Sequence, residues 1–212
     1  MKYKVENGFA TTTGCKDAVG DYEIPFEWWS RKYEYPWVAA QMCKGDVVLD
    51  AGCGISHFFK YWLSDNCKQV VALDGDKRIL DMEDRDNLKF VFSGIEHMPL
   101  DDDTFDKVIC VSVLEHTGDT MHLILDEFAR VLKPTGRLVV TLDIPTIELT
   151  TWQEAVEQSR FEIDEKGKNS LSWDEPEDIL IEPRVMTNAA GARVRVSSKS
   201  RKVFCCSLLL KD

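Results

Sequence analysis

Five short runs rich in Val, Ile and Leu recur through the middle of the chain, each bounded by turn-forming or polar residues. Runs that are apolar on both faces predict buried parallel strands in a sheet covered by helices on each side. The strands are expected at residues 47–50, 69–74, 88–92, 107–113 and 136–142. Helices are expected at residues 56–65, 77–85 and 121–132, the last ended by Lys133-Pro134-Thr135-Gly136. The alternation predicts an α/β doubly wound, mostly parallel sheet.

The two ends of the chain have different patterns. Residues 22–37 hold seven aromatic side chains, and Pro36 is expected to start a short helix that ends near Gly45. Another helix is expected at residues 151–160. Alternating residues in 192–198 and an apolar run in 202–210 predict an antiparallel pair that closes the sheet.

Composition and charge narrow the function classes. No apolar run approaches the roughly 20 residues that span a bilayer, and the N-terminal residues lack the apolar core of a signal peptide, so a cytoplasmic protein with no membrane partner is expected. The net charge of −11 argues against a nucleic-acid partner, although the basic segment from Arg184 onward leaves a macromolecular acceptor open. The cysteines show no Cys-x-x-Cys pair, and His116 and His122 lack a metal-binding spacing, so no metal is expected.

The loops after the predicted strands are the place to look for a ligand site, since open α/β sheets bind ligands at the carboxyl ends of their strands. After the first strand the chain reads Asp50-Ala51-Gly52-Cys53-Gly54. The two glycines allow a sharp turn and close approach of a ligand to the backbone. A dinucleotide-binding loop would carry a third glycine where this chain has His57, which disfavours a pyrophosphate. An acid at the strand end suits an amine-bearing or cationic ligand.

The second strand also ends in an acid. Asp74 lies 20 residues beyond Gly54, where a carboxylate can accept both hydroxyls of a ribose. The predicted ligand is therefore a nucleoside without a pyrophosphate and with a charged, amino-acid-like end. S-adenosylmethionine fits that description.

Four stretches in this order resemble the successive motifs of the class I S-adenosylmethionine-dependent methyltransferases, most closely the branch that acts on small molecules. They are VVLDAGCGISHF, VVALDGD, IEHMPLDDDTFDKVICVSVLEHT and LDEFARVLKPTGRLVVTLDIP. The resemblance implies a seven-stranded Rossmann-like sheet with an antiparallel C-terminal strand. It also implies an N-terminal aromatic helical lid segment (1–45), a cofactor-binding core (46–145), and a C-terminal part of the same domain with an acceptor-site insertion and closing strands (146–212).

The resemblance assigns cofactor contacts residue by residue. Asp50, Gly52 and Gly54 would hold the methionine end, and Asp74 the ribose hydroxyls. The family usually has an acid that reaches the adenine amino group where this chain has Gly94, so that contact would come from the Ile95 backbone, from Glu96 or from elsewhere. Beneath the sulfonium, the floor of the site would be formed by Ser112 and Leu114.

The leading functional hypothesis is methyl transfer to an oxygen or nitrogen of a small-molecule acceptor, such as a sugar or other metabolite. His116 is the candidate base, with a purely structural role in its loop as the alternative. A non-catalytic S-adenosylmethionine-binding regulator and a nicotinamide oxidoreductase are the rival hypotheses. Acceptor specificity is expected to lie in the N-terminal aromatic residues and in residues 146–188, and the sequence leaves the oligomeric state open.

Overall fold

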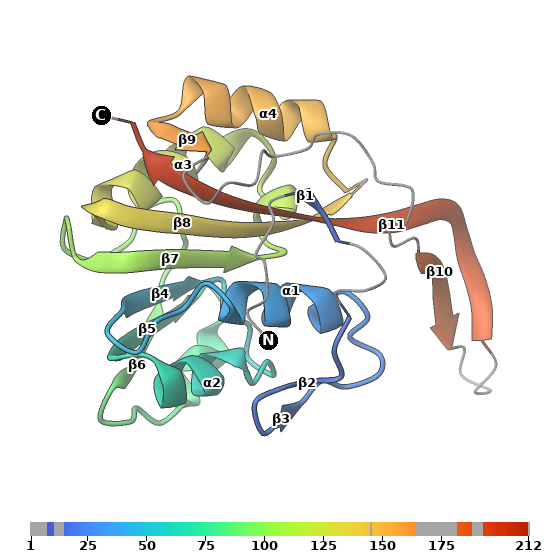
Figure 1. The fold of residues 1–212 in the computed structure, drawn as a ribbon, viewed down its shortest axis with the longest axis horizontal. Coiled ribbons are helices and arrows are strands. Elements are labelled where there is room, and N and C mark those ends of the chain that lie inside the picture. Colours follow the sequence, from blue (N-terminus) through green and yellow to red (C-terminus); the bar gives the residue numbers. More distant parts are fainter. Residues whose placement is uncertain (1–7, 11–14, 145, 164–181, 188–192, 212) are drawn as a thin grey trace.

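The computed structural model describes residues 8–10, 15–144, 146–163, 182–187 and 193–211. Its parallel strands are β4 (Val47–Ala51), β5 (Gln69–Asp74), β6 (Leu88–Phe92), β7 (Phe105–Val111) and β8 (Leu132–Ile144). The long strand β11 (Arg193–Leu210) runs antiparallel to β8 and also pairs with β1 (Gly8–Phe9), β9 (Phe161–Ile163) and β10 (Glu182–Thr187). The order across the sheet is β1-β11-β8-β7-β4-β5-β6 (Figure 1). This order confirms the predicted doubly wound α/β fold with an antiparallel C-terminal strand.

Helices cover both faces of the sheet. On one face α3 (Met121–Val131) and α4 (Leu149–Gln158) pack on a core that includes Leu49, Ala51 and Leu142. On the other face α1 (Arg31–Ala39) and α2 (Phe59–Asn66) pack on a core that includes Val48. Because side chains alternate along a strand, Asp50 shares the face of Val48 and points toward α1 and α2.

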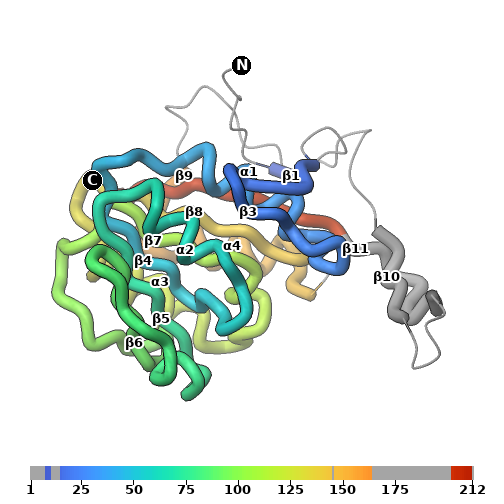
Figure 2. Tube along the Cα trace, turned by 90° about the horizontal axis from the view of Figure 1, so that it is seen from below, coloured from blue at the N-terminus to red at the C-terminus, as the bar shows by residue number. Residues whose placement is uncertain are grey.

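The N-terminal strand β1 lies beside β11 in both views (Figures 1 and 2), with Gly8 opposite Cys205 and Phe9 opposite Phe204. The ring of Phe9 meets that of Phe204 edge to face at 5.3 Å. A short hairpin, β2 (Ala18–Val19) with β3 (Tyr22–Glu23), precedes α1. The N-terminal segment is therefore part of the sheet as well as of the helical layer.

The expected antiparallel pairing of residues 192–198 with 202–210 is wrong. Residues 193–210 form the single strand β11, whose first part pairs with β10 and whose last part pairs with β8. Residues 197–202 read Ser-Ser-Lys-Ser-Arg-Lys and contain no Gly, Pro, Asn or Asp. Without one of these four strong turn formers between the two apolar patterns, the backbone continues extended.

The first helix begins five residues before the position predicted from Pro36, which lies inside α1. Proline has no N–H and cannot bond the carbonyl of Lys32 one turn earlier. That carbonyl instead accepts a hydrogen bond from the backbone N–H of Lys16, at 2.9 Å. An internal proline costs a helix one hydrogen bond and brings its ring against the preceding turn. The contact from Lys16 replaces the lost hydrogen bond.

Three other predicted elements differ from the structure by three or more residues at one end. α2 begins at Phe59 instead of residue 56, and the helix expected at 77–85 is a 3₁₀ helix, η2 (Lys77–Asp81). Strand β8 begins at Leu132, so the predicted turn at Lys133-Pro134-Thr135-Gly136 belongs to the strand as an irregularity in its pairing with β7.

No helix in the part of the chain that the structure describes is long and apolar enough to cross a membrane. The region expected to determine acceptor specificity, residues 146–188, is described only in part: residues 164–181 and 188 lie outside the described residues.

Candidate functional site

A cavity of about 170 Å³ opens at the carboxyl edge of β4 and β7. From β4 the chain continues outward to β5 and β6, and from β7 it continues in the opposite direction to β8, so the strand order reverses between these two strands. This is the position at which open α/β sheets bind ligands. The cavity is lined by Arg31, Tyr35, Asp50, Gly52, Cys53, Gly54, His57, Phe59, Val111, Ser112 and Val113.

The loop after β4 turns at two glycines with left-handed backbone conformation, Gly52 (φ 77°) and Gly54 (φ 61°). A Cβ atom at Gly52 would lie 2.6 Å from Cγ2 of Val113, so neither the conformation nor the space admits a side chain there. The ammonium of the fully buried Lys60 donates to the carbonyls of Gly54 (2.6 Å), Ile55 (3.2 Å) and His57 (2.5 Å). These three bonds hold the loop in place and explain why α2 begins later than predicted.

Asp50 lines the cavity at the end of β4 and is 4% exposed. Burial raises its pKa to about 7, against the opposing charge of Lys60. The neighbouring carboxylate of Asp74 raises this pKa further. A cationic group in the cavity would stabilise the ionised form of Asp50.

Asp74, at the end of β5, is connected to the glycine loop. Its Oδ2 accepts from the backbone N–H of Gly54 at 2.8 Å, and its Oδ1 accepts from that of Asp76 at 2.9 Å. A carboxylate has about four acceptor positions, so these two bonds leave room for two hydroxyl donors. The structure thus brings Asp50, Gly52 and Gly54 together in the cavity lining and joins Asp74, which is not part of that lining, to Gly54; their roles in cofactor binding stay predictions.

The N-terminal helix contributes a buried ion pair to the site. Glu34 in α1 is fully buried and pairs with Arg31 one turn earlier. It also accepts hydrogen bonds from the hydroxyls of Ser112 (2.5 Å) and Thr141 (2.6 Å), at the ends of β7 and β8. Burial by itself would raise the pKa of Glu34, but Arg31 and the two hydroxyls outweigh it and lower that pKa. Ser112 adopts a left-handed conformation (φ 50°) that aims its hydroxyl at α1.

Aromatic rings from α1 and α2 form a wall of the cavity. Tyr35 stacks on Phe59 at 4.4 Å, and its hydroxyl bonds to Nδ1 of His57 at 2.7 Å. The ring of Trp28 lies 4.4 Å from that of His57. Burial, with the nearby charges of Arg31 and Lys60, lowers the pKa of His57 to about 4, so this histidine is neutral at pH 7.

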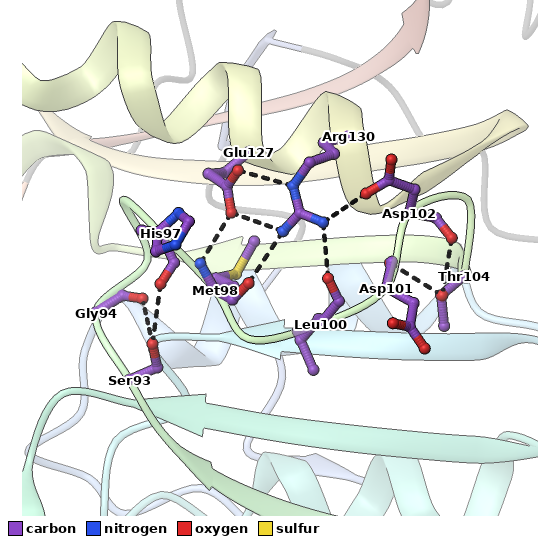
Figure 3. Close-up of polar contacts among 10 residues, drawn as sticks. All are labelled: Ser93, Gly94, His97, Met98, Leu100, Asp101, Asp102, Thr104, Glu127 and Arg130. Carbon is purple, nitrogen blue, oxygen red and sulfur yellow. Dashed lines mark hydrogen bonds and ion pairs between the residues drawn. The ribbon is translucent and has the colours of Figure 1, made fainter.

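The segment between β6 and β7, predicted to contact adenine, is attached to α3 (Figure 3). Arg130 donates to the carbonyls of Leu100 (2.7 Å) and Met98 (3.0 Å) and to the carboxylate of Asp102 (2.7 Å). Glu127 accepts from the backbone N–H of Met98 at 2.8 Å. Arg130 therefore binds the far half of this segment through its backbone, and Asp102 is ion-paired.

Within that segment the structure separates the two proposed adenine contacts. Ile95 is buried in the core between the sheet and α3, while Glu96 is exposed. Gly94 is exposed, and a Cβ there would lie 2.6 Å from Oε2 of Glu96. Neither Ile95 nor Glu96 lines the cavity at the strand reversal, and their role stays a prediction.

The residues expected after the fourth predicted strand point in different directions. Ser112 lines the cavity, whereas Leu114 is fully buried in the core on the opposite face. His116, the candidate base, is exposed at the end of the 3₁₀ helix η3 (Leu114–His116) and does not line the cavity. Its neighbour Glu115 is 7% exposed, accepts from the backbone N–H of Asp143 at 2.9 Å, and keeps Oε2 without a hydrogen-bond partner.

Replacing Glu115 by Gln is expected to stabilise the protein at high pH. Burial raises the pKa of Glu115 from 4.5 to about 7, so the folded state holds this proton more tightly than the unfolded state and loses stability as pH rises through that interval. Relative to the unaltered protein, Glu115→Gln should gain about 3 kcal/mol of unfolding free energy between about pH 4.5 and pH 8. Urea denaturation at several pH values measures this gain, and Glu154→Gln, at an exposed position, should show none.

Sequence reasoning missed the polar side chains of α1. The segment was expected to supply an aromatic lid, and Tyr35 does line the cavity, but Arg31 and Glu34 were not singled out. The available signal was the sequence Ser-Arg-Lys-Tyr-Glu, which places an arginine and a glutamate on one helix face three residues apart. Because the prediction begins the helix at Pro36, Arg31 and Glu34 lie before its predicted start.

The described residues include no group of three or more His, Cys, Asp or Glu side chains that could hold a metal ion. The seven cysteines are present as free thiols, and five of them are buried.

Comparisons with known proteins identify the central part of the chain. Residues 49–140 match the methyltransferase domain family. A malonyl-[acyl-carrier protein] O-methyltransferase of Yersinia pestis is 38% identical over 99 residues, which is 45% of this chain and 36% of that protein. A tRNA U34 carboxymethyltransferase of Desulfotalea psychrophila is 28% identical over 140 residues, 60% of this chain and 42% of that protein. The chain thus spans less than half the length of these two relatives.

The fold is shared with solved structures. A crystal structure of an S-adenosylmethionine-dependent methyltransferase from Mesorhizobium loti superimposes with a TM-score of 0.54 at 15% identity, over 82% of this chain and 97% of that one. The matched residues run from within β4 to within β8 and include the glycine loop and both strand-end acids. Over residues 49–140 the chain is therefore similar to the methyltransferase domain family, and this stretch supplies the central strands of the sheet.

Proposed function

We propose that this chain binds S-adenosylmethionine at the carboxyl edge of β4 and β5 and transfers its methyl group to an oxygen or nitrogen of a small-molecule acceptor, such as a sugar or other metabolite. One observation carries the proposal. Two carboxylates, Asp50 and Asp74, end neighbouring strands, and a glycine loop between them donates the N–H of Gly54 to Asp74 at 2.8 Å.

The residues at this edge of the sheet fit S-adenosylmethionine. Asp50 is a buried acid whose pKa of about 7 would fall beside a cation, which suits an ammonium or sulfonium group. Asp74 has acceptor positions left for the two ribose hydroxyls. The loop between them has glycine where the backbone has φ values that other residues rarely adopt. One edge of the sheet thus offers an acid for a cationic group, acceptors for the ribose hydroxyls, and a glycine loop that a ligand can approach closely.

Methyl transfer asks mainly for alignment of the reacting atoms and exclusion of water. Bound S-adenosylmethionine supplies a methyl group that its positively charged sulfur already activates. The residues of this chain supply the rest: Asp50, Gly52 and Gly54 orient the amino-acid end, while Tyr35 and Phe59 keep water from one wall of the cavity.

His116 remains our candidate for removing a proton from a hydroxyl acceptor. It lies at the end of η3, three residues beyond Val113 of the cavity wall, and is exposed.

A small-molecule acceptor is supported by the net charge of −11, which disfavours approach of a phosphate backbone. The curated relatives differ in acceptor: one acts on malonyl-[acyl-carrier protein], one carries the name demethylmenaquinone methyltransferase, and one modifies tRNA U34. Incubation of the protein with methyl-labelled cofactor and fractionated cell extract tests the acceptor class. Label in the small-molecule fraction is expected, whereas label in tRNA or protein alone would contradict the proposal.

Replacing Asp74 by Ala is expected to weaken S-adenosylmethionine binding about 100-fold, because two hydrogen bonds from hydroxyls to a carboxylate are lost, at roughly 1.5 kcal/mol each. Isothermal titration calorimetry measures this change. The matched control is Asp81→Ala, an exposed acid at the end of η2, which should bind as the unaltered protein does. Retained affinity in Asp74→Ala would remove the ribose assignment.

A non-catalytic cofactor-binding protein is the second candidate, because Gly94 stands where the family usually has the adenine-binding acid. The two candidates share the binding result and differ in the labelling result. A protein that binds S-adenosylmethionine tightly but labels nothing in any fraction would favour the regulator.

A further inference from the structure

The cavity pairs one positive and one negative side chain. Among the described residues that line it, Arg31 is the one side chain that carries positive charge at pH 7, because His57 is neutral with a pKa of about 4. Asp50 is the one acid in the lining. A ligand that carries both an anionic and a cationic group, as an α-amino acid does, matches this pair.

Arg31 keeps donors for such a ligand. Its hydrogen bonds to Ser30 (3.2 Å), to Glu34 and to Ser112 (2.9 Å) all leave from Nη1. A guanidinium has five N–H donors in one plane, and the planar fork suits a carboxylate. The side chain is 16% exposed, and its guanidinium carbon lies 5.7 Å from the centre of the Tyr35 ring.

The orientation of Arg31 is set before any ligand arrives. Glu34 pairs with it and is itself bound by the hydroxyls of Ser112 and Thr141, so the guanidinium is held between α1 and the ends of β7 and β8. Glu34 is therefore a positioning residue, and the same bonds attach α1 to the sheet.

We propose that Arg31 binds the carboxylate of the methionine portion of S-adenosylmethionine while Asp50 binds its ammonium group. The inference rests on the proposed cofactor site and adds a residue outside the matched family region. It means that the N-terminal helix completes the cofactor site, so a chain that lacks α1 would keep the Asp50 contact to the ammonium group and lose the contact to the carboxylate.

The test removes the two partners of the proposed contact, the Arg31 guanidinium and the ligand carboxylate, first separately and then together. Calorimetry compares S-adenosylmethionine with its decarboxylated form, which lacks only the carboxylate, on the unaltered protein and on Arg31→Gln. Loss of a charge-assisted pair should weaken binding about 10- to 100-fold for either single change. In Arg31→Gln the two ligands should bind alike, because the carboxylate has no partner left to lose.

Controls separate this proposal from the proposed function. Arg85→Gln, at an exposed arginine that pairs with Asp65 of α2, should leave both affinities unchanged. If the unaltered protein binds S-adenosylmethionine but does not distinguish the decarboxylated form, or if Arg31→Gln weakens both ligands equally, the arginine assignment fails and the cofactor site stands. Binding of neither ligand by the unaltered protein overturns both. Should Arg31→Gln fail to fold, Arg31→Lys keeps the charge beside Glu34 and should lose about half of the discrimination on a logarithmic scale.

Discussion

Replacing Glu34 by Ala is expected to lower the free energy of unfolding by about 3–5 kcal/mol, because removal of one partner leaves a buried guanidinium without its counter-charge. The carboxylate is fully buried, and the hydroxyls of Ser112 and Thr141 would lose their acceptor at the same time. A domain of ordinary stability has roughly 5–15 kcal/mol in total, so the change should be large in a urea melt.

Glu27→Ala is the matched control for this prediction, since Glu27 is exposed in the same N-terminal segment. It should change stability by less than about 0.5 kcal/mol. If Glu34→Ala costs less than about 1 kcal/mol, the ion pair does not attach α1 to the sheet, and the orientation that we assign to Arg31 loses its support.

The second large effect is expected from Lys60→Met. The ammonium of Lys60 is bonded to three carbonyls of the glycine loop, and its charge opposes the rise in the pKa of Asp50. A methionine has a similar stem and no donor, so these carbonyls would be left without their partner in the interior. We expect a loss of about 2–4 kcal/mol in unfolding free energy, because each unsatisfied buried group costs about 1–3 kcal/mol and the desolvation of the lysine offsets part of the sum.

The same variant should weaken S-adenosylmethionine binding about 100-fold, since the loop that approaches the ligand loses its support. Calorimetry and urea denaturation measure the two effects on one preparation. Lys68→Met removes an exposed lysine just beyond α2 and should leave both quantities unchanged. Normal affinity in Lys60→Met would mean that the glycines alone hold the loop.

The central fold was predictable because each of its strands is a local, continuous signal. The apolar runs at β4, β5 and β7 are largely buried between two helical layers and need no knowledge of distant residues to be recognised. Asp50 and Asp74 follow these runs directly, so parallel pairing of the strands was enough to bring the two acids to one edge. Gly52 and Gly54 have positive φ values, and glycine is the residue that adopts them readily, so the residue type alone indicated a sharp turn.

The limits of elements were less predictable where a distant residue decides them. Pro36 was predicted to start α1, but a hydrogen bond from Lys16 to the carbonyl of Lys32 lets the helix begin at Arg31. Similarly, α2 starts late because Lys60 binds the carbonyls of the preceding turn. In both cases a lysine donates to backbone carbonyls that have no partner within the helix, and the sequence pattern of the helix does not show this contact.

Strand patterning and strand-end chemistry are local properties, so the residues along the chain were enough to predict the doubly wound sheet and to place Asp50, Gly52, Gly54 and Asp74 at or just after strand ends. The contacts of α1 depend on folding instead: Arg31 and Glu34 meet Ser112 and Thr141, which lie about 80 to 110 residues away along the chain. Glu115 and His116 are neighbours in one short helix, yet the folded structure buries the first and exposes the second. Their positions in the sequence do not distinguish them. Burial and charge pairing depend on which surfaces meet, and those surfaces come from segments that sequence spacing does not connect.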